Sequence, residues 1–434
     1  MRKSKAKKRP SISNHVIQRK DHRISKTDIS PNALKVLNRL NSEGFEAYLV
    51  GGSVRDLLLH KAPKDFDVAT NATPNQVRNL FRNARIIGRR FKLVHILYHR
   101  EIIEVATFRG HEPVDEDHKT NEEGMIIRDN VYGTIEEDAF RRDFTINSLY
   151  YSIKDGSIID FTTGFKDVEQ KLIRMIGDPS IRYHEDPVRM LRAIRFSGKL
   201  HFELAEETAA PLNQLSHLIS NVSGSRLFEE MIKFYQCGEA KRAQERLEKY
   251  GLFEKLFPQT SNSIKSNYPT SKLISLALES TDSRINEGKT VNPAFVFAIF
   301  LWFPLLEKTN DLKNKGIEPL PALDQAMSLI ISEQNKVVTI PKRFTQVMRE
   351  IWLLQFRFPK RLGHRAFNIL EHPRFRAAYD FLALRALSGD ESIELADWWT
   401  KFQEVDENEK NLMIEAITKG ASEKSKSKKS KPKK

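Results

Sequence analysis

The stretch LVGGSVRDLLLHKAPKDFDVAT, residues 49–70, decides the fold. Its apolar start ends in Gly51 and Gly52, a short helix-forming segment follows, and the apolar pattern DFDVAT indicates a second strand. Side chains alternate between the two faces of a strand, so Asp65 and Asp67 are expected to point the same way. Their like charges repel each other, and a divalent cation is the group we expect to compensate them.

The sequence around this stretch predicts an α/β domain. Residues 30–44, SPNALKVLNRLNSEG, have the Ser-Pro start, apolar spacing and glycine end of a helix, and Thr73 is a predicted N-cap of another. Residues 91–108 indicate two strands joined at Arg100, and residues 136–151 indicate a further helix. We therefore predict a mixed sheet with helices on at least one side.

Positive charge is concentrated at the two ends of the chain. The net charge is +14; the first ten residues carry six positive charges, and residues 419–434 carry eight lysines against one glutamate. Lys- and Ser-rich runs cannot bury apolar surface, so we predict disordered basic arms at residues 1–29 and 416–434. Binding of nucleic acid is the favoured role of these arms, and solubilising tails or a contact with anionic lipid are the alternatives.

The remaining composition narrows the class of protein. Cys237 is the only cysteine, which excludes an intramolecular disulfide framework and a cysteine-based zinc site, and predicts a reducing, cytoplasmic location. The most apolar stretch, residues 293–306, is too short to span a bilayer and indicates a buried helix. We expect neither a secretory signal nor an integral membrane segment.

The glycine pair has a structural and a functional interpretation. A Gly-Gly turn is commonly only a turn, but glycine also lets backbone N–H groups approach an anion, and Arg55 can bond phosphate oxygens. The carboxylates that follow favour the functional interpretation, because nucleotidyl transfer uses a phosphate loop beside paired carboxylates. Oxygen-only ligands of this kind suit Mg²⁺.

A third acidic residue is expected to complete such a site, and the sequence offers two. Glu104 lies in EIIEVATF, and Asp143 lies in RRDFTINSLYY, residues 141–151. Asp143 either joins the site or forms a structural ion pair, and the pattern leaves both possibilities open.

The segment EDPVRMLRAIRF, residues 185–196, predicts an amphipathic helix. At about 100° per residue, one stripe carries an aspartate and three arginines, and the opposite side is apolar. The stripe is either a solvated face with short-range ion pairs or the wall of a cleft that meets a triphosphate and a base edge. Its members are Asp186, Arg189, Arg192 and Arg195.

Four segments, in this order and spacing, resemble the class II template-independent RNA nucleotidyltransferases, which comprise bacterial poly(A) polymerases and CCA-adding tRNA nucleotidyltransferases. They are LVGGSVRDLLL, KDFDVAT, RRDFTINSLYY and EDPVRMLRAIRF. Three further segments, IIGRRFKLVHI, EVATFRG and EHPRFRAAYDFLALRA, are similar to the poly(A) polymerase branch. The resemblance covers residues 30–405.

The resemblance implies transfer of AMP from ATP to RNA 3′ ends without a template, with addition of CCA to tRNA as the alternative. It implies that Asp65 and Asp67 hold catalytic Mg²⁺, that Asp143 completes the acidic site, and that Glu104 is a further candidate. The nucleotide contacts it implies are Gly51, Gly52, Arg55, Arg142, Asp186, Arg189, Arg192 and Arg195.

The resemblance and the residue pattern agree on the fold class, an α/β nucleotidyltransferase head followed by mostly α-helical neck, body and tail domains. We place the catalytic head at residues 30–180, the neck with the nucleotide-recognition helix at 181–260, and the RNA-binding body and tail at 261–415. The expected partners are RNA 3′ ends, ATP and the RNA-decay machinery, and the expected state is a monomer.

Overall fold

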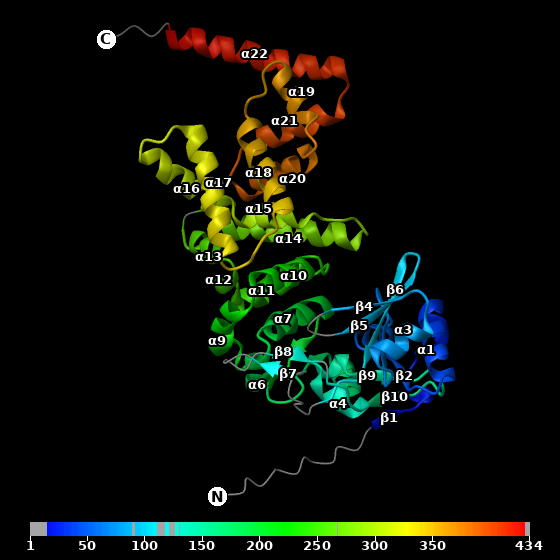
Figure 1. The fold of residues 1–434 in the computed structure, drawn as a ribbon. Coiled ribbons are helices and arrows are strands. Elements are labelled where there is room, and N and C mark those ends of the chain that lie inside the picture. The colour runs from blue at the N-terminus through cyan, green and yellow to red at the C-terminus, as the bar shows by residue number, and fades with distance from the viewer. Residues whose placement is uncertain are drawn as a thin grey trace, which may run out of the picture. The chain divides into compact units, whose positions relative to one another are not determined.

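The computed structural model describes residues 15–88, 92–110, 118–120, 126–129, 131–266 and 268–429 (Figure 1). The chain divides into two compact units, Met1–Leu218 and Ile219–Lys434. The first unit contains the sheet, and the second consists of helices.

An eight-stranded mixed sheet forms the centre of the first unit. The strand order is β1-β10-β9-β2-β3-β6-β5-β4; β3 and β6 run parallel, and the other neighbours run antiparallel. The strands are β1 (His15–Ile17), β2 (Ala47–Val50), β3 (Asp67–Thr70), β4 (Ala84–Ile87), β5 (Leu93–Tyr98), β6 (Glu101–Thr107), β9 (Leu149–Tyr151) and β10 (Ile158–Asp160). Two short pairs lie outside this sheet, β7 (His118–Thr120) with β8 (Ile126–Asp129), and β11 (Leu172–Ile173) with β12 (Glu203–Leu204).

Two of the predicted helices cover the sheet. Helix α1 (Pro31–Ser42) contacts β2, β3 and β6, and α3 (Pro74–Leu80) contacts β4, β5 and β6 (Figure 1). The Thr73 side chain caps α3 as predicted, in a capping box with Gln76. The other helices of this unit are α2 (Gly52–Leu58), α4 (Ile135–Arg141), α5 (Gly164–Glu169), α6 (Pro179–Glu185), α7 (Val188–Leu200), α8 (Glu206–Ala209) and α9 (Leu212–Leu215).

The predicted N-terminal arm is shorter than expected. Residues 1–14 lie outside the described residues, but residues 15–29 belong to the first unit, because β1 is an edge strand of the sheet and pairs with β10. Ile24 and Ile29 are buried, and the His22 ring hydrogen-bonds to the Gly156 carbonyl. The polar composition of residues 15–29 predicted disorder. The pairing of β1 at the sheet edge and the burial of two isoleucines stabilise an ordered conformation instead.

The predicted helix over residues 136–151 is wrong in its second half. Helix α4 ends at Arg141, Arg142 takes an extended conformation, and residues 149–151 form β9. Strand β9 bonds to β2 on one side and β10 on the other, so the sheet determines its conformation in place of local propensity.

The division between the units also differs from the predicted boundary at residue 180. Helices α6 and α7 belong to the first unit, because β11 pairs in parallel with β12 and the Tyr183 hydroxyl donates to the Thr208 carbonyl. The segments that precede and follow α7 in the sequence are therefore bonded to each other, and they hold α7 in the first unit.

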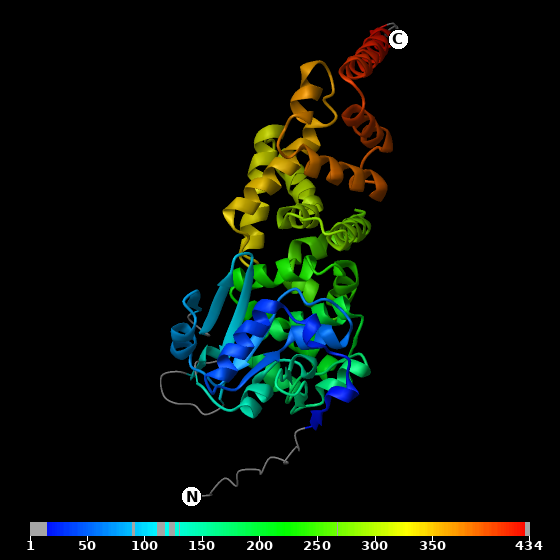
Figure 2. The same cartoon turned by 90° about the vertical axis from the view of Figure 1, so that its right-hand side faces the viewer.

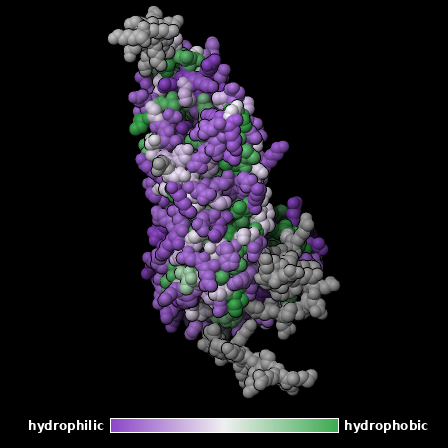
Figure 3. Space-filling view, turned by 90° about the vertical axis from the view of Figure 1, so that its left-hand side faces the viewer, coloured by the Kyte–Doolittle hydropathy of each residue, from purple (hydrophilic) through white to green (hydrophobic). Residues whose placement is uncertain are grey.

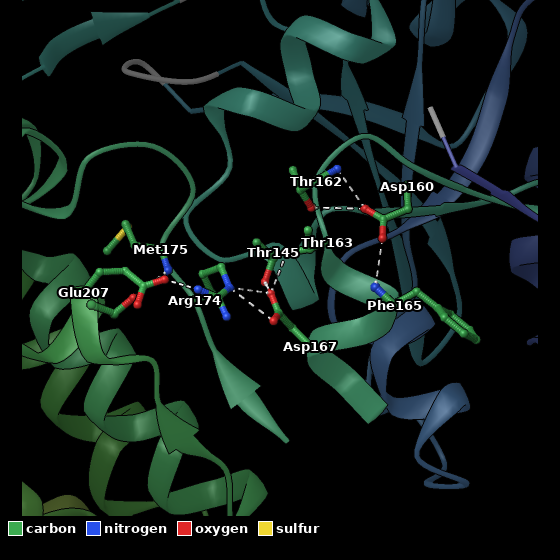
Figure 4. A network of polar contacts seen from close by, with 10 residues as sticks. Thr145, Asp160, Thr162, Thr163, Phe165, Asp167, Arg174, Met175 and Glu207 are labelled. Carbon is green, nitrogen blue, oxygen red and sulfur yellow. Dashed lines mark hydrogen bonds and ion pairs between the residues drawn. The ribbon is translucent and has the colours of Figure 1, made fainter. Parts of the chain in front are cut away.

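A buried carboxylate connects several loops of this unit (Figure 4). Asp167 is 1% exposed and accepts hydrogen bonds from the Thr145 and Thr163 hydroxyls at 2.7 and 2.9 Å. Arg174 Nε lies 3.1 Å from the same carboxylate. The network holds the segment after Asp143 against the segment that leads to β11.

Replacing Asp167 with asparagine is expected to lower the free energy of unfolding by about 1–2 kcal/mol, because it removes the charge from a buried hydrogen-bonded ion pair. Chemical denaturation measures this change. Asp324→Asn is the matched control, since the Asp324 side chain is 76% exposed. Equal stability of the two variants would contradict a structural role for the network.

The second unit contains the helices α10 (Gly224–Tyr235), α11 (Ala240–Lys249), α12 (Leu252–Leu256), α13 (Pro258–Ile264), α14 (Thr270–Asn286), α15 (Pro293–Phe300), α16 (Trp302–Asn314), α17 (Pro319–Asn335), α18 (Lys342–Arg357), α19 (His364–Leu370), α20 (Phe375–Ser388), α21 (Ile393–Glu404) and α22 (Glu407–Lys429) (Figure 2). The buried helix predicted at residues 293–306 is split into α15 and α16. Pro304 cannot donate to the Phe300 carbonyl, and the Thr260 hydroxyl donates to it instead at 2.9 Å.

The predicted C-terminal disorder also differs from the structure. Helix α22 continues to Lys429, because its Ala, Glu and Lys residues favour helix and no proline interrupts it. Residues 430–434 of the predicted tail lie outside the described residues.

Hydrophilic residues predominate on the face shown in Figure 3, with hydrophobic ones scattered among them. Within the described part of the chain, every helix is too short or too polar to span a membrane.

Candidate active site

A cavity of about 250 Å³ lies in the first unit, beside the start of β3. Carboxylates and guanidinium groups from several elements line it, together with four apolar residues. The lining residues are Val50, Asp67, Val68, Leu93, Glu104, Ala106, Arg109, Asp138, Arg141, Arg142, Arg182, Asp186 and Arg189.

Two carboxylates face the cavity from adjacent strands. Asp67 on β3 is in register with Glu104 on β6, and this is the parallel pair of the sheet. Burial and the charges of Glu104 and Asp65 raise the pKa of Asp67 to about 6, although Arg142 opposes the shift. Ionised Asp67 is therefore poorly compensated by the protein alone.

Asp65 lies just outside the strand. Residues 64 and 65 form a bend, and β3 begins at Asp67. The prediction that both carboxylates point the same way assumed that both residues lie on the strand, but only Asp67 does. Asp65 is exposed but close enough for its charge to act on Asp67. Among the described residues, no group of three or more carboxylate, imidazole or thiol side chains is arranged to hold a metal ion.

Arg142 is held at the cavity by a hydrogen-bonded network. Its Nη2 and Nε donate to Asp138 Oδ2 at 2.9 and 3.2 Å, and Nε also donates to the Tyr150 hydroxyl at 2.9 Å. The Tyr150 hydroxyl in turn donates to Asp138 Oδ2 at 2.7 Å. Burial alone would lower the pKa of Arg142, but Tyr150 and Asp138 outweigh it and raise this pKa.

Three more arginines crowd the same space. Burial, reinforced by neighbouring guanidinium groups, lowers the pKa of Arg141 and of Arg182 to about 10. Arg109 has a lowered pKa from burial, with Arg142 adding to the shift. These positively charged side chains repel one another. A bound polyvalent anion would reduce this repulsion, so the arginines are suited to bind one.

The predicted stripe on residues 186–195 divides between two environments. Asp186 and Arg189 line the cavity, and Arg189 Nη1 donates at 2.8 Å both to the Arg182 carbonyl and to Glu185 Oε2. Arg192 instead pairs with Asp143, and the Arg195 guanidinium lies over the Phe196 ring at 4.5 Å. Half of the stripe thus faces the cavity.

The Gly-Gly turn lies beside the acidic residues, but Arg55 points elsewhere. A Cβ at Gly51, whose φ is +78°, would lie 3.7 Å from both Asp67 Oδ2 and Arg142 Nη1. Arg55 is 3% exposed and donates to Asp56 and, at 2.6 Å, to Asn147 Oδ1. The Arg55 guanidinium is thus held by acceptors within the protein, and its phosphate contact stays a prediction.

Asp143 is an ion-pair partner and does not line the cavity. It accepts from Arg192 Nε at 2.7 Å, from the Phe144 amide at 2.8 Å and from Asn147 Nδ2 at 3.2 Å. Burial alone would raise its pKa, but Arg192 and these hydrogen bonds lower it to about 2. Of the two candidates for the third acidic position, Glu104 is the one beside Asp67.

Sequence reasoning missed four charged residues of the cavity. Arg109, Asp138, Arg141 and Arg182 come from three separate segments and lie at the cavity only through tertiary packing. Arg141 was visible in the RRDF motif and Arg109 in EVATFRG, but neither pattern shows the direction of the side chain.

Replacing Tyr150 with phenylalanine is expected to lower kcat for the nucleotidyl transfer that the sequence resemblance implies about three- to tenfold. It is also expected to destabilise the fold by about 1 kcal/mol, because Arg142 and Asp138 lose their shared hydroxyl. Tyr183→Phe is the matched control. Tyr183 is equally buried and its hydroxyl also bonds an oxygen, but that oxygen is the Thr208 carbonyl and belongs to no residue that lines the cavity. Equal kcat for both variants would contradict the positioning role.

The sequence was compared with known families and proteins. The family described as "Poly A polymerase head domain" matches residues 47–174, "Probable RNA and SrmB- binding site of polymerase A" matches 201–264, and "Polymerase A arginine-rich C-terminus" matches 315–434. "Poly(A) polymerase I" of Escherichia coli O157:H7 is 50% identical over 404 residues, 91% of this chain and 86% of the relative. The chain belongs to the poly(A) polymerase I family.

Other relatives agree with this membership. "Poly(A) polymerase I" of Haemophilus influenzae is 46% identical over 93% of this chain and 92% of its own. "CCA-adding enzyme" of Bacillus pumilus is 37% identical over only 55% of this chain and 58% of its own. The predicted poly(A) polymerase branch is therefore confirmed, and CCA-adding enzymes are more distant relatives.

The fold class is confirmed as well. The Bacillus stearothermophilus CCA-adding enzyme in complex with CTP has a TM-score of 0.58 and 24% identity, and the match covers 86% of this chain and 82% of that structure. This chain therefore shares its fold, an α/β nucleotidyltransferase head followed by helices.

Proposed function

We propose that the protein transfers AMP from ATP to the 3′-hydroxyl of RNA without a template and releases pyrophosphate. The cavity carries this proposal, because five arginines face Asp67 and Glu104 across a space of about 250 Å³. Guanidinium groups complement a triphosphate, and the carboxylates lie where a reacting phosphorus and hydroxyl can meet.

The residues of the cavity have separable roles in this proposal. Arg109, Arg141 and Arg182 bind the triphosphate and neutralise the charge that moves to the pyrophosphate as the bond to the α-phosphorus breaks. Arg142, fixed by Asp138 and Tyr150, orients the α-phosphate. Asp186 and Arg189 offer an acceptor and donors to the edge of the base, which supports a role in nucleotide selection.

The acidic residues fit a Mg²⁺ ion. The oxygens of Asp67, with Asp65 and Glu104 close by, are ligands of the kind Mg²⁺ prefers, and the raised pKa of Asp67 indicates an uncompensated negative charge. When bound, Mg²⁺ neutralises phosphate charge and makes the attacking hydroxyl more acidic. We propose Asp67 and Asp65 as its principal ligands.

An extension assay with Mg²⁺ tests the proposal. ATP and CTP are supplied separately, with an unstructured RNA oligonucleotide and with a tRNA that lacks its 3′ CCA. We expect long A tails on the oligonucleotide and no incorporation of C. Addition confined to the tRNA and ending after CCA would contradict the poly(A) assignment.

The cellular setting follows from this activity. We propose that the protein acts as a monomer in the cytoplasm on mRNA and other RNA 3′ ends, and that the added tails promote decay by the RNA-decay machinery. The family match described as an RNA- and SrmB-binding site, over residues 201–264, supports RNA as a partner.

A further inference from the structure

A second cavity lies within the helical unit and is not part of the site described above. Its volume is about 290 Å³, close to the lower limit for small-molecule sites, and its walls come from α14, the loop before α15, α15, α18, the loop before α20, and α20. Its lining joins residues 280–295, which lie outside the three matched family regions, to residues 347–380 of the arginine-rich region.

Three arginines lie at this cavity and provide donors for phosphate. Arg374 Nε pairs with Glu350 Oε2 at 2.9 Å, and Arg376 Nε pairs with Asp380 Oδ1 at 3.0 Å. Both ion pairs use Nε, and this orients the two guanidinium groups. Their Nη atoms make no hydrogen bond among the described residues and are available as donors. Arg374 and Arg376 are 42% and 67% exposed, as phosphate binding requires.

Arg284 supplies the uncompensated charge. It is half-buried at the end of α14, and within the described part of the chain its guanidinium group makes no hydrogen bond or ion pair. Its charge acts on two carboxylates, Asp380 and Glu287. Asp380 is already paired with Arg376, and Glu287 is already paired with Lys289. A positive charge therefore remains for an incoming anion.

The remaining wall suits a flat, apolar group. Phe295 is partly exposed, lines the cavity and packs edge-on against Phe381 at 6.5 Å between ring centroids, which fixes the plane of its ring. Pro373 and Ala377 add apolar surface, and the exposed Thr290 and Asn292 carry polar groups at the loop. Aromatic rings beside arginines are typical of sites that bind single-stranded nucleic acid.

We propose that this cavity binds one nucleotide of a single-stranded RNA chain, with its base against Phe295 and its phosphate on Arg284, Arg374 and Arg376. The inference rests on the proposed function in one respect, namely that the bound nucleotide belongs to an RNA chain. RNA is favoured over a free nucleotide because Arg376 is largely exposed and Arg374 is partly exposed, so both are accessible to the phosphates of a chain that continues beyond the cavity.

The test uses the full-length protein and a fluorescent 20-nucleotide single-stranded RNA without ATP. Arg284→Gln combined with Arg376→Gln is expected to weaken RNA binding about tenfold. It is also expected to reduce the slope of log K against log salt by about 1.4, that is by about 0.7 for each lost phosphate contact. Arg39→Gln is the matched control, because Arg39 forms the same i,i+4 ion pair at 3.0 Å on an exposed helix face.

A second variant separates stacking from charge. Phe295→Leu keeps an apolar side chain and is expected to weaken RNA binding about fivefold with an unchanged salt slope. Melting temperatures verify that each variant is folded.

The outcomes are distinguishable from failure of the proposed function. The inference would be overturned if the Arg284→Gln, Arg376→Gln variant had the same RNA affinity and salt slope as Arg39→Gln. It would also be overturned if that variant bound labelled ATP more weakly but bound RNA normally. Absence of AMP transfer by the unmodified protein would instead overturn the proposed function, and the RNA-binding comparison would still be interpretable.

Discussion

Replacing Asp67 with asparagine is expected to reduce AMP transfer at least about a thousandfold and to raise the melting temperature of the protein at pH 7.5. The first effect follows because Asp67 is the most buried carboxylate proposed to act on the reacting groups. The second follows because the substitution removes a charge that is repelled by Glu104 and Asp65. A steady-state assay and thermal unfolding without Mg²⁺ and ATP measure the two effects.

The pH dependence of stability provides an independent check on Asp67. An acid with a raised folded-state pKa binds its proton more tightly in the folded protein, so its ionisation opposes folding. The penalty begins above the ordinary value of 3.8 and is complete above about 6. The unmodified protein should therefore lose stability relative to Asp67→Asn between these pH values.

Asp324→Asn serves again as the control, because its exposed carboxylate is expected to change neither activity nor melting temperature. Normal transfer by Asp67→Asn would contradict the assignment of the active site. A lowered melting temperature would show instead that the Asp67 carboxylate stabilises the fold.

Replacing Asp143 with asparagine is expected to lower AMP transfer about a hundredfold and the free energy of unfolding by about 2 kcal/mol at pH 7. Asp143 holds Arg192 and Asn147, and the Asn147 side chain and carbonyl accept from Arg55 and Arg142. The loss of one charge would thus loosen the support of Arg142.

A double-mutant cycle with Arg192→Gln distinguishes this structural role from direct catalysis. If Asp143 acts through Arg192, the double variant should be no worse than either single variant. Additive losses of activity would indicate a separate catalytic role, as the family resemblance implies. Since the pKa of Asp143 is lowered, its stabilising effect is present above pH 3.8 and is lost as the pH falls through about 2.

Local sequence patterns predicted much of the fold and part of the site. The Ser-Pro and Thr-Pro helix starts, the strand pair joined at Arg100 and the glycine turn before Asp67 depend on neighbours in the chain, and the structure contains them. The same applies to the helix that carries Arg189, because a 3.6-residue period determines which side chains share a face.

Only the tertiary structure decided which charges meet. Asp67 and Glu104 are neighbours through the parallel pairing of β3 with β6, and Asp143 meets Arg192 across 49 residues of sequence. Arg109, Arg141 and Arg182 enter one cavity from separate segments. The sequence by itself determined most of the elements and the family, and it predicted the types of catalytic side chain. Which charged side chains contact one another depended on packing. A charged residue is equally compatible with solvent, a salt bridge or a cleft, and only the distant segments that surround it decide between these environments.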